Sequence, residues 1–172
     1  MSPRPRTLRA TLAVTAAAAL LLPALAPSAA GAATAPRVQT KVLGRARTLF
    51  RARTVAASAT TVAVGRKRCA VAAGTPLAAL VAARRAGGPA VRVADYGSCS
   101  RRAADGGGLY VTQIGPDRRR GQSGWVYAVD GRVGTAGAAD PFGPFGSGAL
   151  RRGQRVTWYW CRTAGKCEKS VP

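Results

Sequence analysis

The last quarter of the chain, residues 123–162, constrains the fold more than any other segment. Two runs rich in aromatic residues enclose a long loop of glycine, proline and alanine. The run Trp125–Val129 ends at Asp130-Gly131, a dipeptide typical of tight hairpin turns, and predicts a strand. The run Arg155–Cys161 predicts a second strand. Because side chains alternate along a strand, Trp125 and Tyr127 share one face, as do Trp158 and Trp160.

The amino terminus has the order of a secretory signal peptide. Arginines begin it, the apolar run Ala10–Leu22 follows, and small residues come after Pro23. This order predicts export with cleavage after Ala30 or Ala32. An uncleaved membrane anchor is the alternative, but the apolar run falls short of the ~20 residues that a spanning helix needs. We therefore expect a secreted or extracellular protein.

The cysteines agree with export. An even number of cysteines in an exported chain predicts disulfides, and these four are Cys69, Cys99, Cys161 and Cys167. A three-residue hairpin loop over 163–165 would place Cys161 opposite Cys167, within disulfide reach. That pairing leaves Cys69 for Cys99. A four-cysteine zinc site is the alternative, but the chain has no Cys-x-x-Cys pair and no histidine. We expect no metal and no cofactor.

Three segments divide the chain. Residues 1–32 are the expected signal peptide, 33–57 a basic and poorly ordered arm, and 58–172 a single domain. The arm has an alternative interpretation, in which Thr48–Val55 adds one edge strand.

The domain alternates between strand and helix patterns. Thr75 and Pro76 have the residue types of a helix start, followed by an apolar stripe up to Arg84-Arg85. Besides the two aromatic strands we expect a hairpin and two more strands, at 60–64, 68–71, 91–96 and 109–114. This order predicts a small α+β domain in which a mixed sheet packs on one helix.

Two motifs give this order a family resemblance. They are Gly124-Trp125-Val126-Tyr127-Ala128-Val129-Asp130-Gly131 and Leu150-Arg151-Arg152-Gly153-Gln154-Arg155-Val156-Thr157-Trp158. With the preceding hairpin, helix and strands, they resemble the transcobalamin-C-terminal-like domain family over residues 60–162. The resemblance implies a β-grasp-like fold and a module that binds soluble ligands. In transcobalamin the domain closes over cobalamin beside a helical barrel. This chain shows no such helical segment, so cobalamin is not expected.

The chain departs from the family pattern at two places. Asp130 stands where the family usually has Asn, and the loop 134–148 is longer than expected. This loop carries two phenylalanines in a Pro-Phe-Gly repeat. Long loops of this kind are often functional. The phenylalanines either bind a partner or fix the loop onto the core.

The aromatic residues are the candidates for ligand binding: Trp125, Tyr127, Phe142, Phe145, Trp158 and Trp160. Half-exposed tryptophans would stack on a planar or sugar-like ligand, whereas buried ones would form the core between sheet and helix. Of the three tryptophans, we expect Trp158 in the core and Trp125 or Trp160 to be more exposed.

The chain is strongly basic, with 27 Lys and Arg against 6 Asp and Glu and a net charge of +21. Candidate contacts to anionic surfaces are Arg118, Arg119, Arg120, Arg151 and Arg152. Such a charge attracts anionic cell-envelope polymers, although compositional bias toward arginine explains part of it. No motif for sequence-specific nucleic-acid recognition interleaves aromatics with these arginines.

Catalytic residues are scarce. Without histidine, the usual Ser-His and Cys-His nucleophile systems cannot form. The six carboxylates fall largely at predicted turns, and nothing in the sequence pairs Asp95 with Asp105 as an acid and a base. We therefore predict a monomeric, secreted, non-catalytic protein that binds an unknown small ligand or a surface. The alternative is an exported inhibitor-like protein that contacts other proteins through loop 134–148.

Overall fold

The two aromatic runs are neighbouring antiparallel strands, as their pattern predicts. Strand β8 (Gly124–Val129) pairs with β10 (Arg155–Cys161). The computed structural model describes residues 34–97, 99–163 and 167. The expected signal peptide, residues 1–32, lies outside the described residues. So does most of the expected hairpin loop between the last two cysteines.

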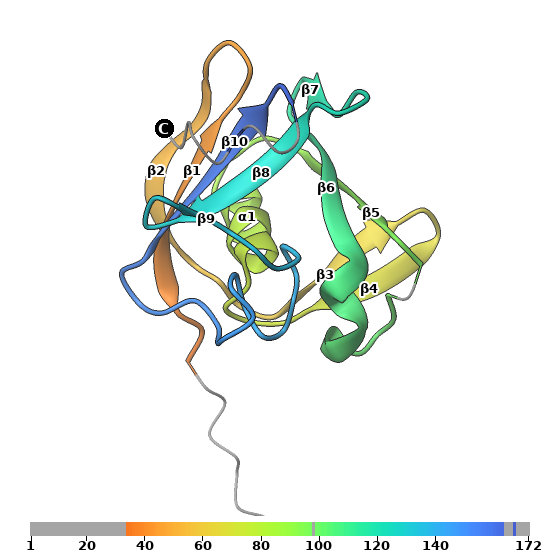
Figure 1. The fold of residues 1–172 in the computed structure, drawn as a ribbon. Coiled ribbons are helices and arrows are strands. Elements are labelled where there is room, and N and C mark those ends of the chain that lie inside the picture. Colours follow the sequence, from red (N-terminus) through yellow and green to blue (C-terminus); the bar gives the residue numbers. More distant parts are fainter. Residues whose placement is uncertain (1–33, 98, 164–166, 168–172) are drawn as a thin grey trace, which may run out of the picture. The chain divides into compact units, whose positions relative to one another are not determined.

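These strands belong to a five-stranded sheet with the order β2-β1-β10-β8-β9 (Figure 1). Strand β1 (Arg37–Leu43) runs parallel to β10, with Val42 opposite Trp158. The other neighbours are antiparallel. Strands β2 (Thr48–Ala56) and β9 (Arg132–Val133) form the two edges. The first strand of the fold is therefore paired with the last one.

Strands β1 and β2 correct the expectation of a basic, poorly ordered arm over 33–57. Strand β2 agrees with the alternative interpretation, an edge strand from Thr48 to Val55, but β1 is absent from the prediction. Val38 and Val42 are fully buried on one face of β1, while Arg37 on the other face is exposed. The cationic outer face gives a core strand the composition of a linker. The folded unit thus begins well before residue 58.

Helix α1 (Pro76–Arg85) begins as the sequence predicts. Thr75 is the N-cap, and its Oγ1 accepts a hydrogen bond of 3.2 Å from the Ala78 amide. Pro76 occupies the first turn, where its missing N–H costs nothing. Gly87 follows with a φ of 90°, a left-handed conformation that ends the helix.

The remaining strands form two smaller sheets instead of joining the large one. One is the expected hairpin, and the other is an antiparallel sheet of three strands, whose first two strands are connected through a short 3₁₀ helix, η1. Their bounds are β3 (Thr60–Val64), β4 (Lys67–Val71), β5 (Val91–Asp95), η1 (Ala103–Gly108), β6 (Leu109–Ile114) and β7 (Asp117–Arg118). The fold is α+β, as predicted, but it has three sheets where one mixed sheet was expected.

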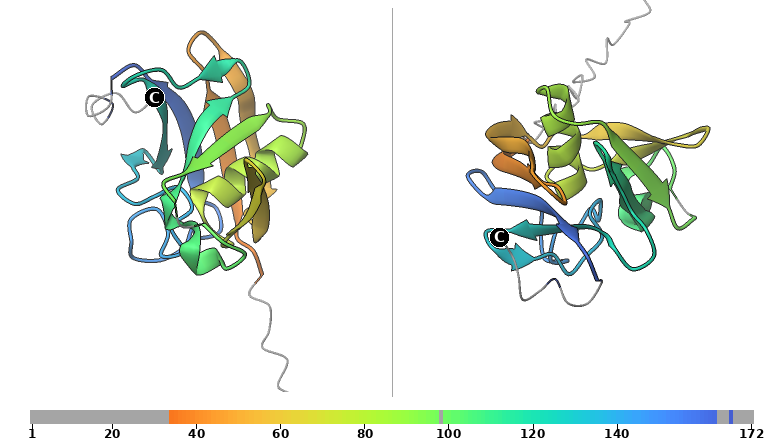
Figure 2. Two further views of the ribbon diagram at one scale, coloured as in Figure 1. Left: turned by 90° about the vertical axis from the view of Figure 1, so that its right-hand side faces the viewer. Right: turned by 90° about the horizontal axis from the view of Figure 1, so that it is seen from above.

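Helix α1 packs on one face of the five-stranded sheet. The two smaller sheets lie on the side of α1 that faces away from the five-stranded sheet (Figures 1 and 2). The core fills the space between these layers. Its least exposed members come from β1, α1, β6 and β10 and include Val38, Val42, Leu77, Leu80, Ile114 and Val156.

Both expected disulfides are present. Cys69 on β4 is bonded to Cys99, with their Cα atoms 5.4 Å apart, and Cys161 at the end of β10 is bonded to Cys167, with 5.8 Å between Cα atoms. By the loop-entropy relation the longer loop contributes about 3–4 kcal/mol and the shorter about 2–3 kcal/mol. Within the described part of the chain, no helix is long and apolar enough to cross a membrane.

Candidate functional site

Four of the five aromatic residues of β8 and β10, all except Tyr159, form two cross-strand pairs on the face of the sheet that α1 covers. Trp158 lies opposite Tyr127, and Trp160 lies opposite Trp125. The pairs are two residues apart on each strand, so both point to the same side. They have very different surroundings.

The Tyr127–Trp158 pair belongs to the core. Trp158 is 1% exposed and Tyr127 is 6% exposed, and their ring centroids are 5.5 Å apart. The Tyr127 hydroxyl donates to the Ala136 carbonyl at 2.7 Å and lies 3.1 Å from the Pro144 carbonyl. Burial, with a smaller contribution from the Asp140 carboxylate, raises the pKa of Tyr127 far above its ordinary value. This pair therefore joins the sheet to loop 134–148.

The Trp125–Trp160 pair is only half buried, as the sequence predicts for at least one of its members. The rings meet edge to face, with centroids 5.5 Å apart. The Trp125 Nε1 group donates to the Asp117 carbonyl at 2.9 Å, and the Arg45 guanidinium lies 5.6 Å from the Trp160 ring. The hydrogen bond thus holds the Trp125 ring in place, while part of the pair stays exposed to solvent.

A second aromatic pair lies near Trp125. Tyr96, just after β5, stacks on Tyr110 of β6 with ring centroids 4.3 Å apart and an interplanar angle of 22°. Tyr96 is 77% exposed, which is unusual for a large aromatic side chain. The Arg119 guanidinium lies 5.3 Å from the Tyr110 ring. A flat, partly cationic surface is therefore open to solvent.

These groups line a groove of about 400 Å³ between β6 and β8. Its walls include Tyr96, Tyr110, Arg119, Ser123, Trp125 and Val126. Aromatic faces attract flat or sugar-like groups, and a guanidinium on an aromatic face contributes about 0.5–1 kcal/mol at an exposed site. The groove can hold a ligand that has a flat face and carries negative charge.

Loop 134–148 lies against Tyr127 and does not line this groove. Its Pro-Phe-Gly repeat forms two successive β-turns, with Gly143 N–H donating to Asp140 O at 2.9 Å and Gly146 N–H donating to Gly143 O at 3.2 Å. Proline takes the second position in each turn, as the turn type favours. The same short motif is thus used twice in tandem.

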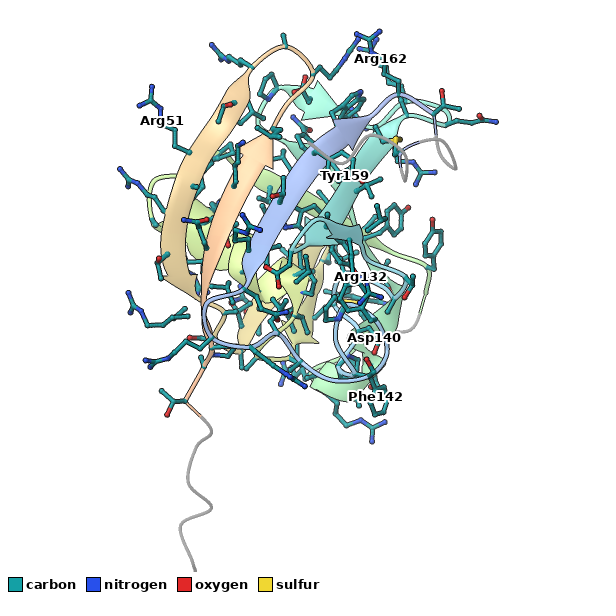
Figure 3. All side chains as sticks on the ribbon, turned by 60° about the vertical axis from the view of Figure 1, so that its left-hand side comes forward. Arg51, Arg132, Asp140, Phe142, Tyr159 and Arg162 are labelled. Atoms are coloured by element: carbon teal, nitrogen blue, oxygen red, sulfur yellow. A yellow bond between two sulfur atoms is a disulfide. The ribbon has the colours of Figure 1, made fainter. Side chains whose placement is uncertain are left out.

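The two turns place their phenylalanines differently. Phe145 packs against the core, with the Arg132 guanidinium 4.5 Å from its ring. Phe142 is 70% exposed, and Figure 3 shows it pointing away from the sheet. Gly134 makes the close approach of the loop possible, because any side chain there would overlap the Tyr127 ring.

The five arginines predicted to contact anionic surfaces are all exposed. Arg119 is the one that lines the aromatic groove, while Arg151 and Arg152 lie in the turn before β10. Only two ion pairs form among the described residues, Arg102–Asp105 and Arg155–Asp130. Most of the positive charge is therefore not neutralised within the fold.

Asp95 and Asp105, the two carboxylates considered above as an acid and a base, each accept hydrogen bonds from nearby residues of the fold. Asp95 Oδ2 accepts the Cys99 amide at 2.9 Å. Hydrogen bonds from the Ser100 hydroxyl and then from Arg102 lower the pKa of Asp105 below its ordinary value. Among the described residues no three His, Cys, Asp or Glu side chains gather as they would around a metal ion.

Of the six aromatic candidates, the structure places Trp125 in the groove and Trp160 behind it. Tyr127 and Trp158 are core residues, Phe145 fixes the loop, and Phe142 is exposed elsewhere. Tyr96 and Tyr110 are not among the residues predicted from the sequence to bind a ligand. A signal existed for Tyr110, because it alternates with Leu109 and Val111, which are both buried.

A comparison with models of known protein families finds no match, and a search of curated proteins finds no significant relative. The resemblance to the transcobalamin-C-terminal-like family therefore stays a prediction.

Proposed function

We propose that this chain is an exported, non-catalytic binding module of the β-grasp type. In this proposal the groove between β6 and β8 holds an anionic ligand with a flat or sugar-like face. One observation carries it: Tyr96, Tyr110 and Trp125 present aromatic surface to a 400 Å³ groove that also contains the Arg119 guanidinium.

The strand order supports the β-grasp assignment. After the hairpin β1–β2 and the separate hairpin β3–β4 comes a helix that packs on the large sheet, and the last strand, β10, lies between β1 and β8 and runs parallel to β1. The resemblance to the transcobalamin-C-terminal-like family also implies a mixed sheet on one helix, but over residues 60–162 and therefore without β1 and β2. The smaller sheets would then be additions to that fold.

The ligand class follows from charge and shape together. An aromatic contact contributes about 0.5–1.5 kcal/mol beyond burial, and an ion pair between an exposed guanidinium and an anionic group contributes about 0.2–1 kcal/mol. Neither contact is strong alone, so a ligand must use both to be retained. Anionic cell-envelope polymers that combine sugar and phosphate groups have both features, and the net charge of +21 attracts them over a longer range.

Export is part of the same proposal. The amino-terminal pattern of residues 1–32 resembles a signal peptide, and the two disulfides are of the kind that persists in oxidising compartments. Secretion can be tested by detecting the mature chain outside the cell and sequencing its amino terminus, which we expect near residue 31 or 33.

The groove can be tested with fragments of an anionic wall polymer and a neutral wall oligosaccharide as probes, with tryptophan fluorescence as the signal. We expect the anionic fragment to bind more tightly, and added salt to weaken it. Trp125→Ala should weaken binding by about 2- to 12-fold while the protein stays folded. Binding that is equal for both probes and unchanged in Trp125→Ala would contradict the proposal.

A charge-matched control separates the groove from the general surface charge. Arg119→Ser removes the guanidinium that lines the groove. Arg66→Ser removes the same charge from the β3–β4 turn, where Arg66 is exposed and lines no part of it. We expect Arg119→Ser to weaken binding severalfold more than Arg66→Ser. Equal losses would mean that only the overall charge attracts the polymer.

A second candidate function, contact with another protein through loop 134–148, rests on Phe142. Intraloop hydrogen bonds hold the turn, including Gly148 N–H to Phe142 O at 2.7 Å, and the phenyl ring is exposed. A rigid loop with an exposed apolar side chain fits the apolar pocket of an extracellular serine protease. Inhibition of such a protease by the native protein, lost in Phe142→Ser, would favour this function. Absence of inhibition would remove it.

A further inference from the structure

Within the described part of the chain, no strand pairs with the outer edge of β2. Strand β2 pairs with β1 on one side and is an edge strand of the five-stranded sheet. The Ala57 amide donates to the Pro36 carbonyl at 2.9 Å, which fixes the alternation of the ladder. In an antiparallel pair, every second residue of a strand directs its N–H toward the neighbouring strand. Because Ala57 directs its N–H toward β1, Val55 does so too, and the amides of Thr54 and Ala56 point away from β1. Among the described residues nothing accepts a hydrogen bond from either amide.

A groove of about 370 Å³ runs beside this edge, between β2 and α1. Its lining includes Thr54, Val55, Ala56, Ala78, Ala82 and Arg85. Two of the three α1 residues in the lining are alanines, so the helix leaves room where larger side chains would have filled the space. Unpaired strand amides therefore lie next to a shallow apolar groove.

The charged residues of β2 and α1, the two elements beside the groove, are all positive. No Asp or Glu precedes Asp95 in the chain, so β1, β2, β3, β4 and α1 contain no acidic residue. Arg51 projects from the β2 side of the sheet, as Figure 3 shows. Arg53 and Arg85 are also exposed, and each makes one hydrogen bond, to Ala86 O at 3.4 Å and to Thr60 Oγ1 at 2.6 Å. Their charges have no acidic partner nearby in the sequence.

We propose that β2 and this groove bind an extended peptide segment of a partner protein, in which aliphatic residues are flanked by Asp or Glu. The peptide would add a sixth strand beside β2. Its backbone would pair with the outward amides of Thr54 and Ala56, its alternate side chains would enter the groove, and its acidic flanks would lie near Arg51 and Arg85. This site shares no lining residue with the aromatic groove, so it is independent of the function proposed above.

A second copy of this chain is a poor occupant. Pairing two β2 edges would bring Arg51 and Arg53 of both copies together with no carboxylate between them, and like charges across paired strands are destabilising. An acidic peptide is favoured by the same charges. The partner is thus defined by its chemistry: extended, aliphatic in the centre and acidic at the flanks.

The test uses the full mature protein and a synthetic peptide with four alternating valine and isoleucine residues between acidic flanks. Titration calorimetry gives the affinity, and amide NMR shifts locate the contact. We expect the largest shifts at Thr54, Ala56 and Ala82. A peptide with lysine flanks should bind at least about tenfold more weakly.

Thr54→Pro removes one outward amide from an edge strand, a place where proline is tolerated. We expect it to weaken peptide binding by about tenfold, since it removes a hydrogen bond and blocks the approach of the added strand. Thr54→Val keeps the amide and should bind within about twofold of the native protein. Ala82→Gln fills the groove from α1 and gives an independent test if Thr54→Pro does not fold.

Several results would overturn the proposal. These are no binding of the acidic peptide at millimolar concentration, shifts confined to the aromatic groove, or equal affinity for native protein, Thr54→Pro and Ala82→Gln. Self-association that is abolished by Thr54→Pro would show that a second copy occupies the edge instead.

Discussion

The two aromatic pairs of β8 and β10 have almost the same sequence context and opposite environments. Both lie on the same face of the same two strands, two residues apart. The Tyr127–Trp158 pair is buried beneath loop 134–148, whereas the Trp125–Trp160 pair lies half exposed beside the aromatic groove. The strand pattern determines which face an aromatic occupies. What covers that face further along the strand decides whether the residue stabilises the core or meets a ligand.

Trp158→Ala should have the largest effect. The side chain is fully buried between β1 and β8, so its removal leaves a cavity and costs about 3–5 kcal/mol of unfolding free energy. Urea unfolding followed by circular dichroism measures this loss. A cost below about 1 kcal/mol would mean that the two pairs do not differ as their burial indicates.

Tyr127→Phe should have the next largest effect. It removes the hydroxyl that contacts the Ala136 and Pro144 carbonyls and leaves buried acceptors without that donor. We expect a loss of about 1–3 kcal/mol and faster proteolysis within loop 134–148. Unchanged proteolysis would show that other contacts, such as those of Phe145, hold the loop.

The same hydroxyl predicts a dependence on alkaline pH. Burial favours the neutral phenol, so the pKa of Tyr127 is higher in the folded protein than its unfolded value of about 10. Its contribution is complete below pH 10 and is lost as the pH rises above it, by up to about 1.4 kcal/mol per pH unit. The stability difference between native protein and Tyr127→Phe should therefore shrink between pH 10 and 11. A constant difference would place Tyr127 in a more solvated setting.

Much of the local structure could be predicted from the sequence, because local rules determine it. The helix begins at Pro76 since Thr75 caps it, and Asp130-Gly131 turns between β8 and β9 with both residues at positive φ. The disulfide pairing of Cys161 with Cys167 followed from the short spacing. The burial of Trp158 and the partial exposure of Trp125 also agree with the prediction.

The long-range pairings could not be predicted in the same way. Strand β1 pairs with β10, which lies more than a hundred residues later, and no local pattern in Arg37–Leu43 indicates that partner. The buried Thr40 also interrupts the apolar alternation of β1. Likewise, Tyr96 and Tyr110 meet only because β5 pairs with β6. The groove is built from residues that the fold, and not the sequence spacing, brings together.

Trp125→Phe should have the smallest effect and tests the exposed side of the comparison. Phenylalanine keeps most of the ring but loses the hydrogen bond of 2.9 Å from Nε1 to the Asp117 carbonyl, so we expect a loss of about 1 kcal/mol or less of unfolding free energy.

Trp158→Phe is the matched control. Trp158 Nε1 has no hydrogen-bond partner among the described residues, so Trp158→Phe breaks no hydrogen bond and removes an unsatisfied buried donor. We expect the cavity left by the buried ring to outweigh this gain and to make Trp158→Phe the more destabilising change. Acrylamide quenching of the remaining tryptophans gives a second readout: removing Trp125 should lower the accessible fluorescence, whereas removing Trp158 should leave it. If Trp158→Phe is the milder change and the quenching is unaltered by Trp125→Phe, the half-exposed pair is not the accessible one and the groove loses its aromatic wall.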